Sequence, residues 1–124
     1  MNSYKDLDVW KKSMDLVLDI YNITSEFPQD EKYGLSSQMK RAAVSIPSNI
    51  AEGQTRHSYK EFIHFLLIAR GSCAELETQV LLCERLGLIE KENGEATTKA
   101  INEINRMING LINNLNLKIK ESRQ

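Results

Sequence analysis

Residues 58–89 read SYKEFIHFLLIARGSCAELETQVLLCERLGLI, and this stretch decides the fold class. Ser58 and Glu61 form a capping-box pattern, in which the serine accepts from an early helix amide and the glutamate can bond back. Gly87 follows the last apolar position, where a glycine commonly ends a helix. Between the two ends, apolar residues recur every three or four positions. They are Phe62, Phe65, Leu66, Ala69, Cys73, Leu76, Val80, Cys83 and Leu86. The stretch therefore predicts one helix about 43 Å long, at a rise of about 1.5 Å per residue.

A similar pattern near the N-terminus predicts a helix from about Asp6 to about Ser25. It should end before Phe27-Pro28, because the residue before a proline is pushed out of the α region. Polar residues fill one side of this segment, and an apolar stripe with steps of three or four fills the other. The stripe comprises Leu7, Trp10, Met14, Val17, Leu18 and Tyr21.

Residues 29–34 are a polar connection, and a second helix is predicted from Leu35 to about Gly53, which is expected to end it in the left-handed conformation. Pro47 lies inside this helix and predicts a kink, because proline lacks the backbone donor and clashes with the carbonyl four residues earlier. Its apolar stripe comprises Leu35, Met39, Ala42, Ala43, Ile46 and Ile50.

A fourth helix follows the polar stretch 90–94 and carries a heptad-like seam with steps of 3-4-3-4. The seam comprises Ile101, Ile104, Ile108, Leu111 and Leu115, with Met107 and Ile112 beside it. The charged tail after Lys118 is expected to fray. No alternating apolar run bounded by turn residues predicts a strand. The expected fold is all-α: one antiparallel up-down-up-down four-helix-bundle domain over residues 1–124.

The amino-acid composition excludes some classes of function for this chain. The 124 residues are 41% hydrophobic and 27% charged, with 16 basic and 17 acidic side chains and a net charge of −1. This balance excludes a uniformly basic nucleic-acid coat. No apolar run approaches the roughly 20 residues of a membrane span, and no apolar block suggests a signal peptide. Two cysteines make no disulfide framework. We therefore expect a soluble cytoplasmic protein.

Candidates for metal and nucleophile chemistry are few. His57, Glu61 and His64 have spacings that could place three ligands on one helical face, although a solvated helix face near a loop is the simpler explanation. A single Glu-x-x-His sequence cannot hold two metals as di-iron bundles do. Cys73 and Cys83 fall among apolar positions, which predicts buried thiols. We expect no catalytic residue, no metal and no cofactor.

The polar stripe on the second helix can be interpreted in two ways. Its members Arg41, Ser45, Asn49 and Glu52 are spaced by four, four and three residues, and the third helix offers Ser72, Glu75 and Gln79. If these helices pack antiparallel, an arginine–carboxylate pair at their border would fix the register. Alternatively, the stripe is a recognition surface.

Charge is unevenly distributed along the chain. Residues 38–72 hold five basic side chains against two acidic ones, which leaves 11 basic and 15 acidic residues elsewhere. The five are Lys40, Arg41, Arg56, Lys60 and Arg70. They are the candidate nucleic-acid contacts, because lysine and arginine supply most phosphate contacts. The alternative is an ordinary charged loop.

Residues 27–90 carry a set of motifs that resembles a known family. The quoted parts are Phe27-Pro28, Glu31-x-Tyr33-Gly34-Leu35, Gln38-x-x-Arg41-Ala42-Ala43, Ser45-Ile46-x-x-Asn49-Ile50-Ala51-Glu52-Gly53 and Ala69-x-Gly71-Ser72-x-x-Glu75-Leu76. The chain resembles the four-helix-bundle proteins encoded in intervening sequences of bacterial 23S ribosomal RNA genes. The accessory variability proteins of diversity-generating retroelements look like relatives. The likeness starts at Asp6 and covers nearly the whole chain.

The resemblance implies a ring-like homo-oligomer, most simply a pentamer, without catalysis or membrane contact. It implies binding to RNA or other nucleic acid as one role, and its motif residues Arg41, Ser45, Asn49, Glu52, Gly53, Ser72 and Glu75 carry no known active site. One alternative is a structural or adaptor protein that binds another protein, such as a reverse transcriptase. Another is a metal-assisted hydrolase that uses His57, Glu61 and His64.

Overall fold

The computed structural model describes residues 3–31 and 34–123. Four helices dominate it: α1 (Asp8–Thr24), α2 (Leu35–Gln54), α3 (Tyr59–Arg85) and α4 (Lys91–Ser122). Two short 3₁₀ turns, η1 (Tyr4–Asp6) and η2 (Gln29–Glu31), precede α1 and α2. No strand occurs in these residues. The predicted all-α class with four helices is confirmed.

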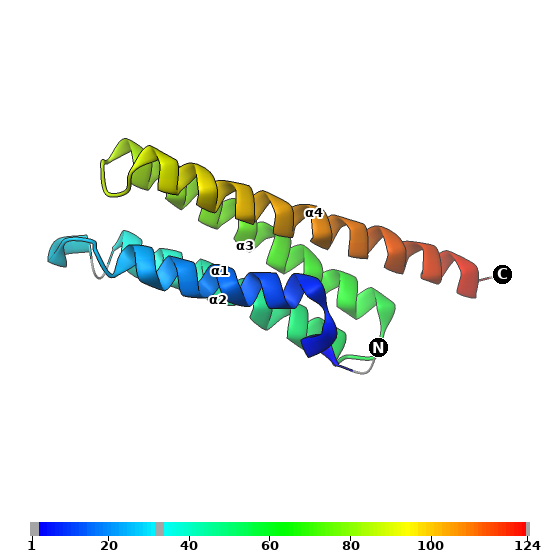
Figure 1. The fold of residues 1–124 in the computed structure, drawn as a ribbon. Helices are drawn as coiled ribbons and strands as arrows, with labels where there is room; N and C mark the ends of the chain where they lie inside the picture. The colour runs from blue at the N-terminus through cyan, green and yellow to red at the C-terminus, as the bar shows by residue number, and fades with distance from the viewer. Residues whose placement is uncertain (1–2, 32–33, 124) are drawn as a thin grey trace.

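The helices pack as neighbours around a shared core. α2 packs on α3, α3 packs on α4, and α1 packs on both α2 and α4. Within the described ranges α1 does not contact α3, and α2 does not contact α4, so each of these pairs lies on a diagonal of the bundle. Figure 1 shows α1 beside α2 and α3 beside α4, joined by short connections. Every helix therefore has one side toward the core and one toward the surroundings.

The predicted core stripe of α2 is confirmed. Met39, Ala42, Ala43, Ile46 and Ile50 are all buried, and Leu35 packs against them while partly exposed. The helix continues through buried Pro47 to Gln54, and the kink there stays a prediction.

The seam of α4 differs from the predicted one at a single position. The buried residues are Ile101, Ile104, Ile108, Ile112 and Leu115. Leu111 is only partly buried, so placing it in the seam was wrong and Ile112 takes its place. A strict 3.5-residue repeat drifts by about 20° per heptad on a straight helix, which moves the seam toward the later residue.

The predicted core stripe of α1 is wrong at Met14, Leu18 and Tyr21, which are 42%, 68% and 47% exposed. Its members Trp10 and Val17 are partly buried and pack against the core. The helix also buries residues that were not predicted, namely Val9, Leu16 and Ile20 with the polar Ser13 and Thr24. Only Leu7, at the N-cap, is both predicted and buried. α1 therefore has apolar residues on two faces, and the one with larger side chains points outward.

The ends of α3 follow the sequence signals. The Ser58 hydroxyl accepts a 3.3 Å hydrogen bond from the Glu61 amide, although no bond from the Ser58 amide to the Glu61 side chain is found in this part of the chain. Gly87 has a φ of 75°, and the Leu88 amide donates to the Cys83 carbonyl, which is the six-to-one bond of a Schellman cap. Leu86 is 62% exposed, so its predicted place in the core was wrong.

Gly53 is needed for close packing and not for a left-handed cap. It lies within α2 and is buried, and the residue with positive φ in the following turn is His57, at 59°. A Cβ atom at Gly53 would lie 2.8 Å from the Phe65 Cβ and 3.2 Å from the Phe62 carbonyl oxygen. The missing side chain therefore lets the start of α3 pack directly on the end of α2.

α4 is longer than predicted at both ends. It begins at Lys91, includes the buried Gly94, and continues to Ser122 through the tail that was expected to fray. Across residues 3–31 and 34–123, none of the helices is both long enough and apolar enough to cross a membrane.

Candidate nucleic-acid interface

Basic side chains gather where the start of α3 meets the end of α4. Lys60 of α3 and Lys120 and Arg123 from the end of α4 line a shallow groove of about 470 Å³. The other lining residues are Ile63, Asn116 and Ile119. We call this surface the basic groove. It presents three cations beside an amide and two apolar side chains, a combination suited to a phosphate backbone with an adjacent base or sugar.

The α4 contribution to the basic groove was not predicted. The basic window predicted from the sequence covers only residues 38–72, and the tail after Lys118 is predicted to fray. Instead, Ile119 continues the four-residue step from Leu115 and is partly buried, which holds the last turns of α4 beside α3. Lys118 lies with its ammonium 5.9 Å from the centre of the Tyr59 ring. The Leu115–Ile119 spacing was the signal that could have extended the helix and located these lysines.

Arg56 lies at the same end of the bundle but is engaged within its own chain. Its guanidinium donates to the Glu52 carboxylate at 2.8 Å and lies 5.2 Å from the centre of the Phe65 ring. The neighbouring carboxylate neutralises much of the charge that a phosphate would meet. Of the five predicted contacts, Lys60 therefore faces the basic groove and Arg56 lies next to it in a paired state.

The other three predicted contacts lie away from this end. The Lys40 ammonium sits 5.0 Å from the centre of the Tyr21 ring on α1. Arg70 donates to the Asn109 side chain at 3.0 Å, in the middle of the α3–α4 border. Arg41 is exposed on α2. The structure does not bring Lys40, Arg41 and Arg70 together with Lys60.

The polar stripe of α2 meets α3 through hydroxyl groups. Ser72 donates to the Ser45 hydroxyl at 2.8 Å, and the Asn49 amide donates to the Ser45 carbonyl and hydroxyl oxygens. The expected arginine–carboxylate pair between the helices is not formed in the described residues: Arg41 of α2 and Glu75 of α3 are both exposed and take part in none of the ion pairs, and Glu52 pairs with Arg56. The hydroxyl contact fixes the register at lower desolvation cost than a charged pair.

Arg41 and Glu75 remain exposed along the same border. Gln79 is buried, and its Oε1 atom has no hydrogen-bond partner in the part of the chain that the structure describes. Tyr33, another residue of the quoted motifs, lies outside the described residues.

The candidate metal ligands do not form a site. His57 lies in the α2–α3 turn, while Glu61 and His64 lie on α3, and no group of three or more His, Cys, Asp or Glu side chains able to hold a metal occurs within residues 3–31 and 34–123. Both cysteines are buried, as expected. Burial, reinforced by Glu77, raises the pKa of the Cys73 thiol to about 12, and burial with Glu31 raises the pKa of Cys83 to about 11. Neither thiol is a nucleophile at neutral pH.

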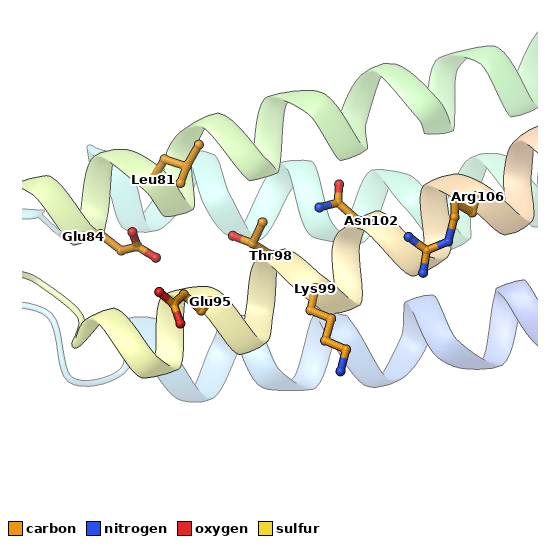
Figure 2. A pocket seen from close by; sticks show the side chains of 7 residues that line it. All are labelled: Leu81, Glu84, Glu95, Thr98, Lys99, Asn102 and Arg106. Atoms are coloured by element: carbon orange, nitrogen blue, oxygen red, sulfur yellow. The ribbon is translucent and has the colours of Figure 1, made fainter.

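A second groove, of about 490 Å³, lies along the border of α3 and α4 and has a different charge pattern. Figure 2 shows Glu84 of α3 and Glu95 of α4 close together at one end, with Lys99 and Arg106 further along. The paired carboxylates would repel a phosphate backbone. This groove is therefore a poorer nucleic-acid site than the basic groove.

The chain is similar in sequence and in fold to known proteins. Residues 5–110 match the family model described as 23S rRNA-intervening sequence protein. A crystal structure of a protein with unknown function from the S23 ribosomal protein family of Bacteroides thetaiotaomicron VPI-5482 is 30% identical. The alignment covers 84% of this chain and 97% of that one, with a TM-score of 0.78. No curated protein matches the chain.

Proposed function

We propose a function on the premise that this chain belongs to the family of 23S rRNA-intervening sequence proteins. The protein is a non-enzymatic, self-associating RNA-binding protein of the cytoplasm. Its subunit is an antiparallel up-down-up-down bundle, and its assembly is a ring-like homo-oligomer, a pentamer by resemblance to the family's relatives. The basic groove is where it contacts RNA.

The observation that carries the RNA contact is the exposed basic groove. Lys60, Lys120 and Arg123 come from two helices and line one surface, and none of them forms an ion pair within the described chain. Charges held together without internal partners keep their attraction for phosphates and release counterions when they bind. Because the whole chain has a net charge of −1, binding must come from this local concentration of charge and not from a general positive field.

Charge reversal in the groove tests the proposal. Lys60→Glu with Lys120→Glu should weaken binding of a fluorescent structured RNA hairpin, and should reduce the slope of log affinity against log salt by about two. The matched control is Lys91→Glu with Lys99→Glu, which changes the net charge equally but alters exposed residues near the start of α4. Equal binding by both double variants, or no binding by the wild type at low salt, would contradict an RNA role for this groove.

A second candidate function is an adaptor that binds another protein. The observation that favours it is the set of large apolar side chains left exposed on α1 and α3, which include Leu18 and Leu82. Contiguous exposed apolar surface commonly marks a protein–protein contact. Absence of RNA binding by the wild type at low salt would leave this function as the better one.

A further inference from the structure

The outward side of α1 is apolar in its middle. Met14, Leu18 and Tyr21 follow one another at steps of four and three, so they form one stripe, which we call the α1 outer face. Leu18 lies two residues from both Leu16 and Ile20. Two residues turn an α-helix by about 200°, so Leu18 points away from the core that these neighbours enter. The α1 outer face therefore lies on the side of the helix opposite to the buried core.

The outward side of α3 is also apolar and is longer. Its five large side chains are between 41% and 62% exposed, and we call them the α3 outer face: Leu67, Ile68, Leu81, Leu82 and Leu86. Between the two ends of this face, Gly71 and Ala74 are exposed and small, and a Cβ atom placed on Gly71 would meet nothing within 4 Å. Glu75 and Thr78 are also exposed in this middle section. A helix from another molecule has room over Gly71 and Ala74 and large apolar contacts at both ends.

The two faces point in opposite directions. α1 and α3 lie on a diagonal of the bundle, since each packs on α2 and α4 and they do not contact each other in the described residues. A face directed away from the core on α1 cannot meet a face directed away from the core on α3 of the same chain. Two unlike surfaces on opposite sides of a subunit suit a head-to-tail contact between copies.

The charges beside the two faces are complementary. Asp15 and Asp19 are exposed next to Leu18 on α1, three and one residues away. Arg85 is exposed between Leu82 and Leu86 on α3. Opposite charges at the border of an apolar contact favour the correct partner and orientation. Pairing α3 with α3 would instead leave the α1 outer face uncovered.

We propose that the α1 outer face of one chain docks on the α3 outer face of a second copy of the same chain. This inference rests on the proposed self-association and specifies its surface. The contact is heterologous, because different patches of identical subunits meet. An open assembly then keeps one unused α1 outer face at one end and one unused α3 outer face at the other, so the contact propagates until the rotation closes a ring.

Two glutamate substitutions and their mixture test the face assignment by sedimentation. Leu18→Glu destroys the α1 outer face and Leu82→Glu destroys the α3 outer face, and each alone should weaken assembly at least about tenfold. Mixed together, the two variants still offer one intact pair of faces, so they should form a one-to-one heterodimer and stop there. Leu117→Glu is the control, since Leu117 on α4 is 59% exposed and belongs to neither face. Met14→Glu repeats the α1 test at a second position.

The outcomes separate this inference from the proposed function. A wild-type chain that remains a 14.2 kDa monomer contradicts self-association itself. A wild type that assembles while Leu18→Glu and Met14→Glu assemble equally well overturns only the assignment of faces, because an α3–α3 contact would behave in that way. A mixture that forms no heterodimer, although both variants keep their helical circular dichroism, overturns it as well.

Discussion

α1 and α2 use their apolar residues in different ways. α2 concentrates its apolar residues on one side, where Met39, Ile46 and Ile50 are fully buried, and it exposes only Val44 among its larger ones. α1 buries Leu16 and Ile20 but leaves Met14, Leu18 and Tyr21 exposed on the opposite side. The same helical periodicity thus gives α2 a single apolar side, which is buried, and gives α1 a buried side and an exposed one. The exposed side of α1 is the surface that the proposed contact between copies would cover.

The largest expected effect compares two leucines of α1. Leu16 is 2% exposed and Leu18 is 68% exposed. Leu16→Ala should lower the free energy of unfolding by about 2–5 kcal/mol, because it removes buried surface and leaves a cavity. Leu18→Ala should change it by less than about 0.5 kcal/mol. Urea unfolding at equal, submicromolar concentration is the measurement, since association would stabilise the folded chain. Equal losses of unfolding free energy at both positions would show that the two faces of α1 do not differ in burial.

A smaller effect compares two glycines in different packing environments. Gly53→Ala should destabilise the protein by about 1–3 kcal/mol, because the new Cβ overlaps Phe65 and the Phe62 carbonyl at the α2–α3 crossing. Gly110 lies inside α4 with nothing within 4 Å of an added Cβ. Gly110→Ala should stabilise by up to about 1 kcal/mol through helix propensity. The melting temperatures of the two variants measure these changes. A Gly53→Ala variant that melts at or above the wild-type temperature would mean that α2 and α3 are packed less tightly at Gly53 than the structure shows.

The smallest effect concerns the buried thiols. The pKa values of Cys73 and Cys83 are raised from 9.0 to about 12 and about 11 in the folded chain. Unfolded chains therefore lose these protons first as the pH rises, so the stability from the protonated thiols is nearly full at pH 7.5 and falls progressively as the pH approaches and passes 9.0, the pKa of the unfolded thiols. Between pH 7.5 and pH 9.0 the loss should be about 0.4 kcal/mol per thiol, where an unfolded thiol becomes half ionised. Urea unfolding at both pH values, with Cys73→Ala and Cys83→Ala as controls, measures it. An unchanged slope in the double variant would assign the pH dependence to other groups.

The buried face of a helix was predicted correctly where the helix has one apolar side and one polar side. In α2 the apolar residues fall on a single side, so periodicity alone identifies the buried face. In α1 two apolar sets share one helix, and periodicity cannot tell which set points inward. The predicted stripe followed steps of three or four through Met14, Leu18 and Tyr21, which the structure places on the exposed side. That choice depends on where α2 and α4 lie, which is a tertiary property.

The candidate site was predicted only in part for a similar reason. Lys60 was found because it follows a recognisable turn between two helices. Lys120 and Arg123 are about as far along the chain as they can be from Lys60, and they join it only because α3 and α4 lie side by side (Figure 1). Counting charges within windows of the sequence does not reveal which helices lie next to each other in the fold. Conversely, Arg56 was counted as a contact although Glu52, one turn earlier, pairs with it.

The proposed self-association covers the exposed apolar residues of this chain with further copies of it. Sedimentation equilibrium of the wild type at micromolar concentration measures the size of that assembly. The expected mass is a whole-number multiple of 14.2 kDa, as for a closed ring, and it falls toward the monomer mass on dilution. A single 14.2 kDa species throughout the micromolar range would contradict it, because Leu18 and Leu82 would then have no copy of the chain to cover them.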